Sequence, residues 1–163
     1  MNDKHIVVMG VAGCGKSTVG ETVARELGVS YVEGDDFHLP ESREKMSQGI
    51  PLTDADRFPW LDALNALMTS SDEPLVVSCS ALKQIYRERL GAGINLLFVF
   101  LDVPEPDVLQ RVRTRDHFFP ESLVADQFAV LEVPTGDNVI GVDARRPLDE
   151  VVADVQVRLK AAL

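Results

Sequence analysis

Short runs of almost entirely apolar residues alternate along the chain with stretches in which apolar residues recur at helical spacing. The apolar runs, which predict buried β-strands, cover residues 5–9, 31–33, 75–79, 96–101 and 139–142. The helical patterns lie over residues 16–27, about 59–68, 81–90, 107–113, 122–133 and 147–163. Strands that are apolar on both faces and alternate with helices are typical of a parallel sheet covered on both sides. The pattern therefore predicts an α/β, three-layer fold with a five-stranded parallel sheet and helices on both faces.

No internal repeat, low-complexity tract or linker interrupts this pattern, which predicts a single domain over residues 1–163. Two segments, 36–58 and 113–121, are the least regular and the richest in charge. Right-handed crossovers bring the carboxyl ends of parallel strands to one edge of the sheet, where such folds bind their ligands. We therefore expect a substrate-binding insertion at about 36–60 and a mobile lid at about 113–121.

Composition narrows the choice of partners and compartment. The formal net charge of −10 argues against nucleic acid or an anionic membrane as a partner. No apolar run approaches the roughly 20 residues that cross a bilayer. The first predicted strand begins so near residue 1 that no signal peptide is expected. The 2 cysteines, Cys14 and Cys79, do not resemble a disulfide framework, so we expect a cytoplasmic protein.

A glycine-rich sequence follows the first predicted strand. Residues 10–17 read Gly-Val-Ala-Gly-Cys-Gly-Lys-Ser, which matches the phosphate-binding loop (P-loop) pattern G-x-x-x-x-G-K-[ST]. The glycines let backbone N–H groups point at one phosphate, the lysine adds a positive charge, and the serine hydroxyl is placed to bind Mg²⁺. A strand before the loop and a helix after it complete the motif. The residues predicted to bind ATP with Mg²⁺ here are Gly10, Gly13, Cys14, Gly15, Lys16 (also expected to act in catalysis), Ser17 and Thr18.

The second predicted strand ends in carboxylates, in the sequence Glu33-Gly34-Asp35-Asp36. Beside the P-loop, one carboxylate can orient an acceptor hydroxyl and take its proton, and another can act at Mg²⁺. We assign the first role to Asp35 and the second to Glu33, which acts together with Ser17. An acidic turn that caps the next segment is the structural alternative. Asp102, at the end of the fourth strand, also stays open as a magnesium residue.

Basic and polar residues are concentrated in the insertion and at the end of the third strand. An arginine there is suited to hold a carboxylate through two parallel hydrogen bonds, and hydroxyl and ammonium groups add further contacts to an anionic acceptor. The predicted acceptor-binding residues, besides Asp35, are His38, Lys45 and Arg57 in the insertion and Ser80, Lys83 and Arg87 after the strand. A structural role for His38 and a core position for Trp60 are the plainer alternatives.

Arg111, Arg113 and Arg115 place 3 arginines within five residues of an acidic chain. A solvated basic helix end, favourable against the helix dipole, is one interpretation. We favour a lid that grips phosphate, because an enzyme that transfers a phosphoryl group has to exclude water. Arg115 is then expected to act in catalysis.

Five blocks of the chain carry a resemblance to a known family. They cover residues 10–18, 34–38, 45–61, 79–87 and 117–132. The first block is shared by many kinases, whereas Pro51-Leu52-Thr53-Asp54-Ala55-Asp56-Arg57 with Pro59-Trp60, and Cys79-Ser80-Ala81-Leu82-Lys83, are specific. Together they resemble the gluconokinase family of small P-loop kinases.

The resemblance implies a P-loop kinase fold and ATP-dependent phosphorylation of D-gluconate at its terminal hydroxyl. The products would be 6-phospho-D-gluconate, which feeds the pentose phosphate pathway, and ADP. It also implies that Arg111 and a loop with Arg146 and Pro147 hold the adenine ring, and it suggests a homodimer. The alternative is a P-loop kinase for another small anionic acceptor, such as shikimate or a nucleoside monophosphate. A nucleotide-dependent regulator is disfavoured, because the sequence has no guanine-reading Asn-Lys-x-Asp.

Overall fold

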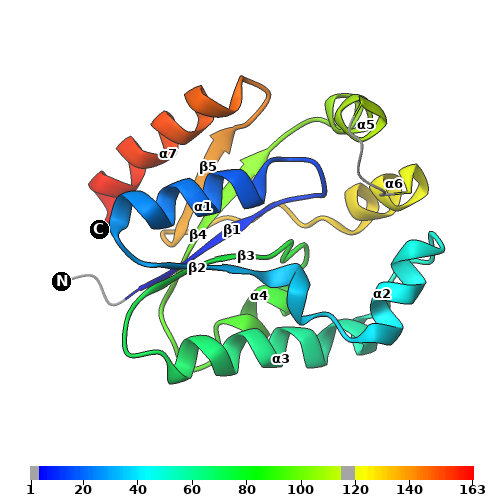
Figure 1. Ribbon diagram of the computed structural model, residues 1–163, viewed down its shortest axis with the longest axis horizontal. Coiled ribbons are helices and arrows are strands. Elements are labelled where there is room, and N and C mark those ends of the chain that lie inside the picture. The colour runs from blue at the N-terminus through cyan, green and yellow to red at the C-terminus, as the bar shows by residue number, and fades with distance from the viewer. Residues whose placement is uncertain (1–3, 115–119) are drawn as a thin grey trace.

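The computed structural model describes residues 4–114 and 120–163. A parallel sheet runs through the middle of the molecule (Figure 1). Its strands are β1 (His5–Met9), β2 (Ser30–Glu33), β3 (Leu75–Ser78), β4 (Leu96–Asp102) and β5 (Val139–Asp143). They lie in the order β2-β3-β1-β4-β5, and every neighbouring pair is parallel. The predicted five-stranded parallel sheet is confirmed, and each strand end lies within one residue of its prediction.

Helices cover both faces of the sheet, as predicted (Figure 1). On one face lie α1 (Lys16–Leu27) and α7 (Leu148–Ala162), and on the other lie α3 (Asp54–Ser70) and α4 (Gln84–Leu90). Successive strand residues point to opposite faces. Ile6 and Val8 therefore pack with α1 and α7, whereas Val7 and Met9 pack with α3 and α4. None of the helices in the described part of the chain has the length and apolarity needed to cross a membrane.

The remaining helices lie toward the end of the molecule where the strands have their carboxyl ends (Figure 1). They are the 3₁₀-helix η1 (Gly34–Phe37), α2 (Pro40–Ser47), α5 (Glu105–Thr114) and α6 (Glu121–Val130). After β1, the chain forms β2 and β3 on one side of that strand and then crosses over to form β4 and β5 on the other side. Ligands of such folds bind at this change of direction, at the carboxyl ends of the strands.

The segment 36–58, expected to be irregular, is largely helical. It contains α2, and α3 begins at Asp54 instead of at about residue 59. A capping box starts α3: the Thr53 hydroxyl accepts from the Asp56 N–H, and the Asp56 carboxylate accepts from the Thr53 N–H. Pro59 lies in the second turn, where it removes one N–H donor without ending the helix. The cap, and not the proline, therefore marks the start of the helix.

Candidate active site

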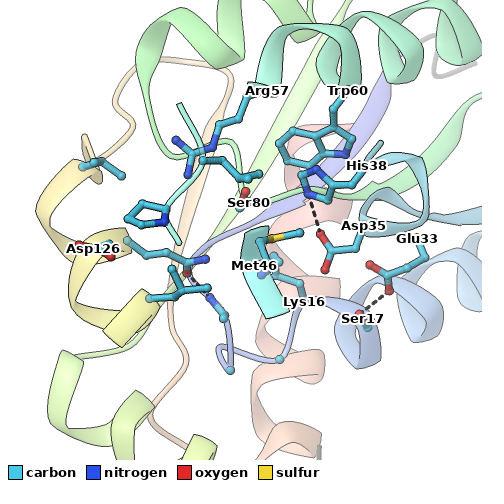
Figure 2. Close-up of a pocket in the computed structure, with 18 of the residues that line it drawn as sticks. Lys16, Ser17, Glu33, Asp35, His38, Met46, Arg57, Trp60, Ser80 and Asp126 are labelled. Carbon is cyan, nitrogen blue, oxygen red and sulfur yellow. Dashed lines mark hydrogen bonds and ion pairs between the residues drawn. The ribbon is translucent and has the colours of Figure 1, made fainter. Parts of the chain in front are cut away.

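A cavity of about 570 Å³ opens at the carboxyl end of the sheet, bordered by the P-loop, the end of β2, α3 and α6. Figure 2 shows Lys16 and Ser17 toward one end of it, Arg57 and Ser80 toward the other, and Asp35 between. Ten of the residues predicted from the sequence to act in the site line this cavity: Gly13, Gly15, Lys16, Ser17, Thr18, Glu33, Asp35, His38, Arg57 and Ser80.

The P-loop joins β1 to α1 and faces the cavity with its backbone. Gly13 and Gly15 have φ angles of 79° and 99°, which side-chain-bearing residues rarely adopt. The first residues of α1, where the helix dipole is positive, line the same cavity. The Lys16 ammonium is held over the loop, because its Nζ donates to the Val11 carbonyl oxygen at 3.1 Å. Backbone donors, a helix N-terminus and one ammonium thus converge, as the phosphates of a nucleotide require.

The Glu33 carboxylate is bound by three hydroxyl groups. Ser17 Oγ and Tyr31 Oη donate to its Oε2 at 2.5 and 2.8 Å, and Ser78 Oγ donates to its Oε1 at 2.9 Å. Burial alone would raise the pKa of Glu33, but these hydrogen bonds outweigh it and hold the pKa below its ordinary value. Glu33 is therefore ionised at neutral pH. An ionised carboxylate against a serine hydroxyl supplies the oxygen ligands that Mg²⁺ prefers, so the donor set fits the ion.

A close approach between β2 and β3 fixes the position of the next carboxylate. A Cβ atom on Gly34 would lie 2.0 Å from the Ser78 carbonyl oxygen, so only glycine fits. The Trp60 indole N–H donates to the Gly34 carbonyl oxygen at 2.7 Å and secures the turn from the other side. This turn, η1, carries Asp35 into the cavity with 66% of its side chain exposed. Its carboxylate is accessible to a substrate hydroxyl.

His38 is buried between Asp35 and Trp60. Its ring stacks on the Trp60 indole with centroids 4.0 Å apart, and its Nε2 lies 3.7 Å from Asp35 Oδ1. Burial lowers the pKa of His38 to about 4, although the negative charge of Asp35 acts in the opposite direction and raises it. The imidazole is therefore neutral at neutral pH, and within the described residues its buried Nδ1 has no hydrogen-bond partner. A neutral ring on the cavity wall can pair with a hydroxyl-rich ligand.

Arg57 lies toward the other end of the cavity and is oriented by a tyrosine. Its Nη1 donates to Tyr86 Oη at 2.7 Å, and its guanidinium carbon lies 5.2 Å from the Tyr86 ring centroid. Tyr86 in turn donates to Asp54. One edge of the guanidinium is thus fixed on a residue that lines the cavity, and the planar fork suits a carboxylate.

Lys45 and Lys83, both predicted to bind the acceptor, do not line the cavity. Lys45 Nζ lies 2.9 Å from Asp56 Oδ2, and Lys83 Nζ lies 3.1 Å from Asp54 Oδ1. The ammonium of Lys45 lowers the pKa of Asp56 to about 2, so this carboxylate is ionised at neutral pH. The first turn of α3 therefore supplies each lysine with a carboxylate of the chain itself.

Arg87 also lies apart from the cavity lining, although the sequence predicts it to bind the acceptor. It is buried, and its guanidinium donates to the carbonyl oxygens of Ala81 at 2.7 Å and Glu132 at 2.9 Å. Ala81 has a φ of 45°, an uncommon conformation for a residue with a side chain. The structure thus assigns Arg87 to holding the loop that follows β3, which carries Ser80 into the cavity.

The residues predicted to border the adenine lie beside the P-loop. Arg111 of α5 donates to the Gly13 carbonyl oxygen at 3.1 Å and to the Ala144 carbonyl oxygen at 2.6 Å. It therefore ties the P-loop to the loop between β5 and α7. That loop contains Arg146, which pairs with an aspartate of α7 at 2.7 Å, and Pro147, which precedes the helix. The structure thus brings α5 and the loop between β5 and α7 together at one side of the P-loop.

Four other residues considered in the sequence analysis lie outside the cavity lining or outside the described residues. Gly10 and Cys14 belong to the P-loop but do not line the cavity, and Cys14 is fully buried. Arg115 lies outside the described residues, as does most of the predicted lid. Asp102, the alternative magnesium residue, is exposed at the end of β4 and does not line the cavity.

The residues that support Glu33, and one whole wall of the cavity, are not among those predicted from the sequence. Tyr31 lies on the same strand face as Glu33 because it is two residues earlier, and Ser78 pairs with Glu33 in register. Ser78 is the polar position of an otherwise apolar strand, which is a usable signal. The missed wall belongs to α6, where residues at helical spacing line the cavity: Leu123, Asp126, Gln127 and Val130.

The arrangement suits transfer of a phosphoryl group from a nucleotide to a hydroxyl. Phosphate-binding donors and Lys16 occupy one end of the cavity, and the accessible carboxylate of Asp35 lies beside them. Arg57 provides a fixed cation on the side where an acceptor would extend. Positioning and charge stabilisation are what such a reaction asks of a protein.

Known proteins resemble this chain in both sequence and fold. A family model described as shikimate kinase matches residues 12–129. The thermoresistant gluconokinase of Escherichia coli is 42% identical over 161 residues, which cover 93% of this chain and 91% of the relative. The gluconokinase of Gluconobacter oxydans is 41% identical over 161 residues, covering 95% and 90%. The crystal structure of a gluconokinase from Sinorhizobium meliloti is 47% identical, with a TM-score of 0.90 over 98% of this chain and 93% of that one. This chain belongs to the gluconokinase family of small P-loop kinases.

Proposed function

We propose that this protein transfers the terminal phosphoryl group of ATP to the terminal hydroxyl of D-gluconate. The products are 6-phospho-D-gluconate, which feeds the pentose phosphate pathway, and ADP. The observation that carries the proposal is that a single cavity is lined by the P-loop, by the exposed carboxylate of Asp35 and by the guanidinium of Arg57. Gluconate is a small polyhydroxy carboxylate, so it needs a cation at one end and a hydroxyl-orienting group at the other.

The P-loop is proposed to hold the phosphates of ATP. Backbone N–H groups around Gly13 and Gly15 surround them, and Lys16 stabilises the charge on the group in transfer. Arg111, with Arg146 and Pro147, borders the adenine. Mg²⁺, when bound, offsets the charge on the phosphate oxygens, and Ser17 and Glu33 are the residues that would hold it.

Asp35 is proposed to orient the terminal hydroxyl of gluconate and to accept its proton. Support comes from its place in the cavity next to the P-loop and from the packing of Gly34 and Trp60, which fixes its turn. The transition state of phosphoryl transfer is loose, so positioning of the hydroxyl matters more than the basicity of the carboxylate.

The other end of gluconate is proposed to lie against the remaining polar side chains of the cavity. Arg57 binds the carboxylate, and Ser80 and the neutral imidazole of His38 bind hydroxyls along the chain of the sugar acid. Lys45 and Lys83 are paired with aspartates, so we propose that they support α3 instead of contacting the acceptor.

A coupled ADP-release assay tests the proposal. Gluconate, related aldonates, shikimate and nucleoside monophosphates are compared as acceptors, with ATP and Mg²⁺ in excess. We expect gluconate to give the highest kcat/KM of the set. Equal or better turnover of shikimate or of a nucleoside monophosphate would overturn the assignment in favour of another anionic acceptor.

Assembly and compartment are further parts of the proposal. A homodimer stays a prediction from the family resemblance, and light scattering after size exclusion measures it. A reducing, cytoplasmic compartment is supported by Cys14 and Cys79, which are both free and buried.

A further inference from the structure

One side chain of α6 reaches the backbone of the P-loop directly. The amide oxygen Oε1 of Gln127 accepts a hydrogen bond from the Ala12 N–H at 2.7 Å, across 115 positions of sequence. Ala12 lies within the P-loop, and both residues line the cavity that also contains Lys16. The contact therefore joins the α6 wall of the cavity to the loop that faces the nucleotide.

This hydrogen bond determines which way the amide of Gln127 faces. A backbone N–H can only donate, so the oxygen of the amide turns toward Ala12. The Nε2 group, which can only donate, is then directed away from that N–H. The P-loop thus fixes the orientation of a neutral side-chain donor in the cavity that it lines.

The C-terminal end of α6 is anchored separately, so the position of Gln127 does not depend on one hydrogen bond. Glu132, just beyond the helix, donates its N–H to the Leu82 carbonyl oxygen at 2.8 Å and accepts from the Gln84 N–H at 2.7 Å. Arg87 donates to the Glu132 carbonyl oxygen at 2.9 Å. These bonds tie α6 to the segment that follows Ser80. Gln127 is therefore held between the P-loop and the acceptor end of the cavity.

We propose that Gln127 is a catalytic residue whose Nε2 group donates a hydrogen bond to an oxygen of the phosphoryl group in transfer. The inference rests on the proposed function and adds a residue to it. Figure 2 shows the neighbouring Asp126 across the cavity from Asp35, so α6 approaches the reacting groups from the side opposite the acceptor base. In a loose transition state charge is spread over the oxygens of the transferring group, so a fixed donor binds that state more tightly than the ground state.

Two substitutions separate this role from a purely structural one. Gln127→Glu keeps an oxygen acceptor for the Ala12 N–H but removes the Nε2 donor. Gln127→Met has similar length and removes both. Gln110→Met, at an exposed position of α5, is the matched control. Steady-state kinetics with gluconate and calorimetric binding of MgADP are measured for each folded variant.

We expect both Gln127 variants to lower kcat by about 100-fold or more, in the range for loss of one donor to a developing charge. The Kd for MgADP should change less than about threefold, since the phosphate-binding backbone and Lys16 remain. Gln110→Met should leave both quantities unchanged. Wild-type kcat in Gln127→Glu would overturn the inference, because it would show that the Ala12 contact is sufficient. A loss of MgADP affinity in Gln127→Met equal to the loss of kcat would overturn it too, since the residue would then only shape the loop.

The slow hydrolysis of ATP without any acceptor separates this inference from the proposed function. Transfer to water uses the same donor but needs no gluconate. If the wild type does not phosphorylate gluconate but Gln127→Met still lowers its ATP hydrolysis by about 100-fold, the proposed function fails and the role of Gln127 stands. If Gln127→Met leaves both reactions at the wild-type rate, the role of Gln127 fails and the proposed function stands.

Discussion

The phosphate end and the acceptor end of the cavity are built by different means. At the phosphate end the lining is the P-loop backbone around Gly13 and Gly15 and the first residues of α1, whose directions follow from the conformation of the loop. At the acceptor end the groups are side chains from η1, α3 and the loop after β3. Several charges near that end are already paired within the chain, as Lys45 is with Asp56 and Lys83 is with Asp54.

This difference determines how much of each end can be recognised from a short sequence motif. A backbone site is specified by glycine positions and one lysine in a short segment, so it can be recognised from sequence alone. A side-chain site depends on which charges remain free after the chain has paired its own. The two ends should therefore respond differently to substitution: the phosphate end with loss of turnover, the acceptor end with graded changes in KM.

The largest effect is expected at the phosphate end. Lys16→Ala should lower kcat by about 10³-fold or more. The variant lacks the ammonium group that stabilises negative charge on the phosphoryl group in transfer. The coupled ADP-release assay measures the loss, and circular dichroism checks the fold. Lys160→Ala, at an exposed site near the end of α7, is the control and should match the wild type. Unaltered kcat in a folded Lys16→Ala would show that this loop does not serve catalysis.

Asp35, where the two ends meet, should give the next largest effect. Asp35→Asn keeps the shape but removes the proton acceptor, and kcat should fall by about 10²-fold. MgATP affinity should stay within about twofold, since the P-loop is intact. Asp36→Asn, its exposed neighbour, is the matched control. If Asp35→Asn instead weakens MgATP binding and spares turnover at saturation, the carboxylate serves the metal, and Glu33 becomes the next candidate for acceptor contact.

A smaller, graded response is expected from the basic residues at the acceptor end. Arg57→Lys removes the planar fork and should raise KM for gluconate by about tenfold with kcat little changed. Lys45→Met and Lys83→Met should raise it by less than about threefold, because each ammonium is paired with an aspartate of α3 and lies outside the cavity lining. The comparison of the three KM values is the measurement. A lysine variant as defective as Arg57→Lys would show that pairing with aspartate does not keep the lysine from the acceptor.

The last prediction concerns the stability of the fold and involves His38. The pKa of His38 is about 4 in the folded protein, below the ordinary 6.5. As the pH falls below 6.5 the unfolded chain binds a proton before the folded one, so the free energy of unfolding decreases until about pH 4. Protonation of His38 should lower the free energy of unfolding by about 1–3 kcal/mol between pH 6.5 and about pH 4. His38→Phe keeps a ring against Trp60 and should reduce the loss. Urea unfolding of the wild type and of His38→Phe at pH 7.5 and 4.5 measures this difference. An equal decrease in the free energy of unfolding in the two proteins would contradict a lowered pKa of His38.

The sheet and the P-loop could be predicted because their signals are local. Apolar runs gave the strands, and the glycine spacing gave the phosphate-binding residues. The support of Glu33 could not be predicted in the same way, because Ser78 reaches it across 45 positions through strand register. The apolar spacing predicts a helix from about Pro59, whereas the Thr53 cap starts α3 at Asp54. The burial of Arg87 and its carbonyl partners could not be predicted, because they depend on tertiary packing.

The absence of a side chain at Gly34 also limits how this enzyme can be altered. Glu33 and Asp35, on either side of it, are the groups assigned to the metal and to the acceptor, and a Cβ at 34 would lie 2.0 Å from the Ser78 carbonyl oxygen. Any substitution there would displace both carboxylates together, so metal and acceptor geometry cannot be adjusted independently through this turn. Libraries that aim at new sugar-acid acceptors should therefore keep residues 33–35 constant. Their diversity belongs on α3 and on the loop after β3, which supply Arg57 and Ser80 to the acceptor end of the cavity.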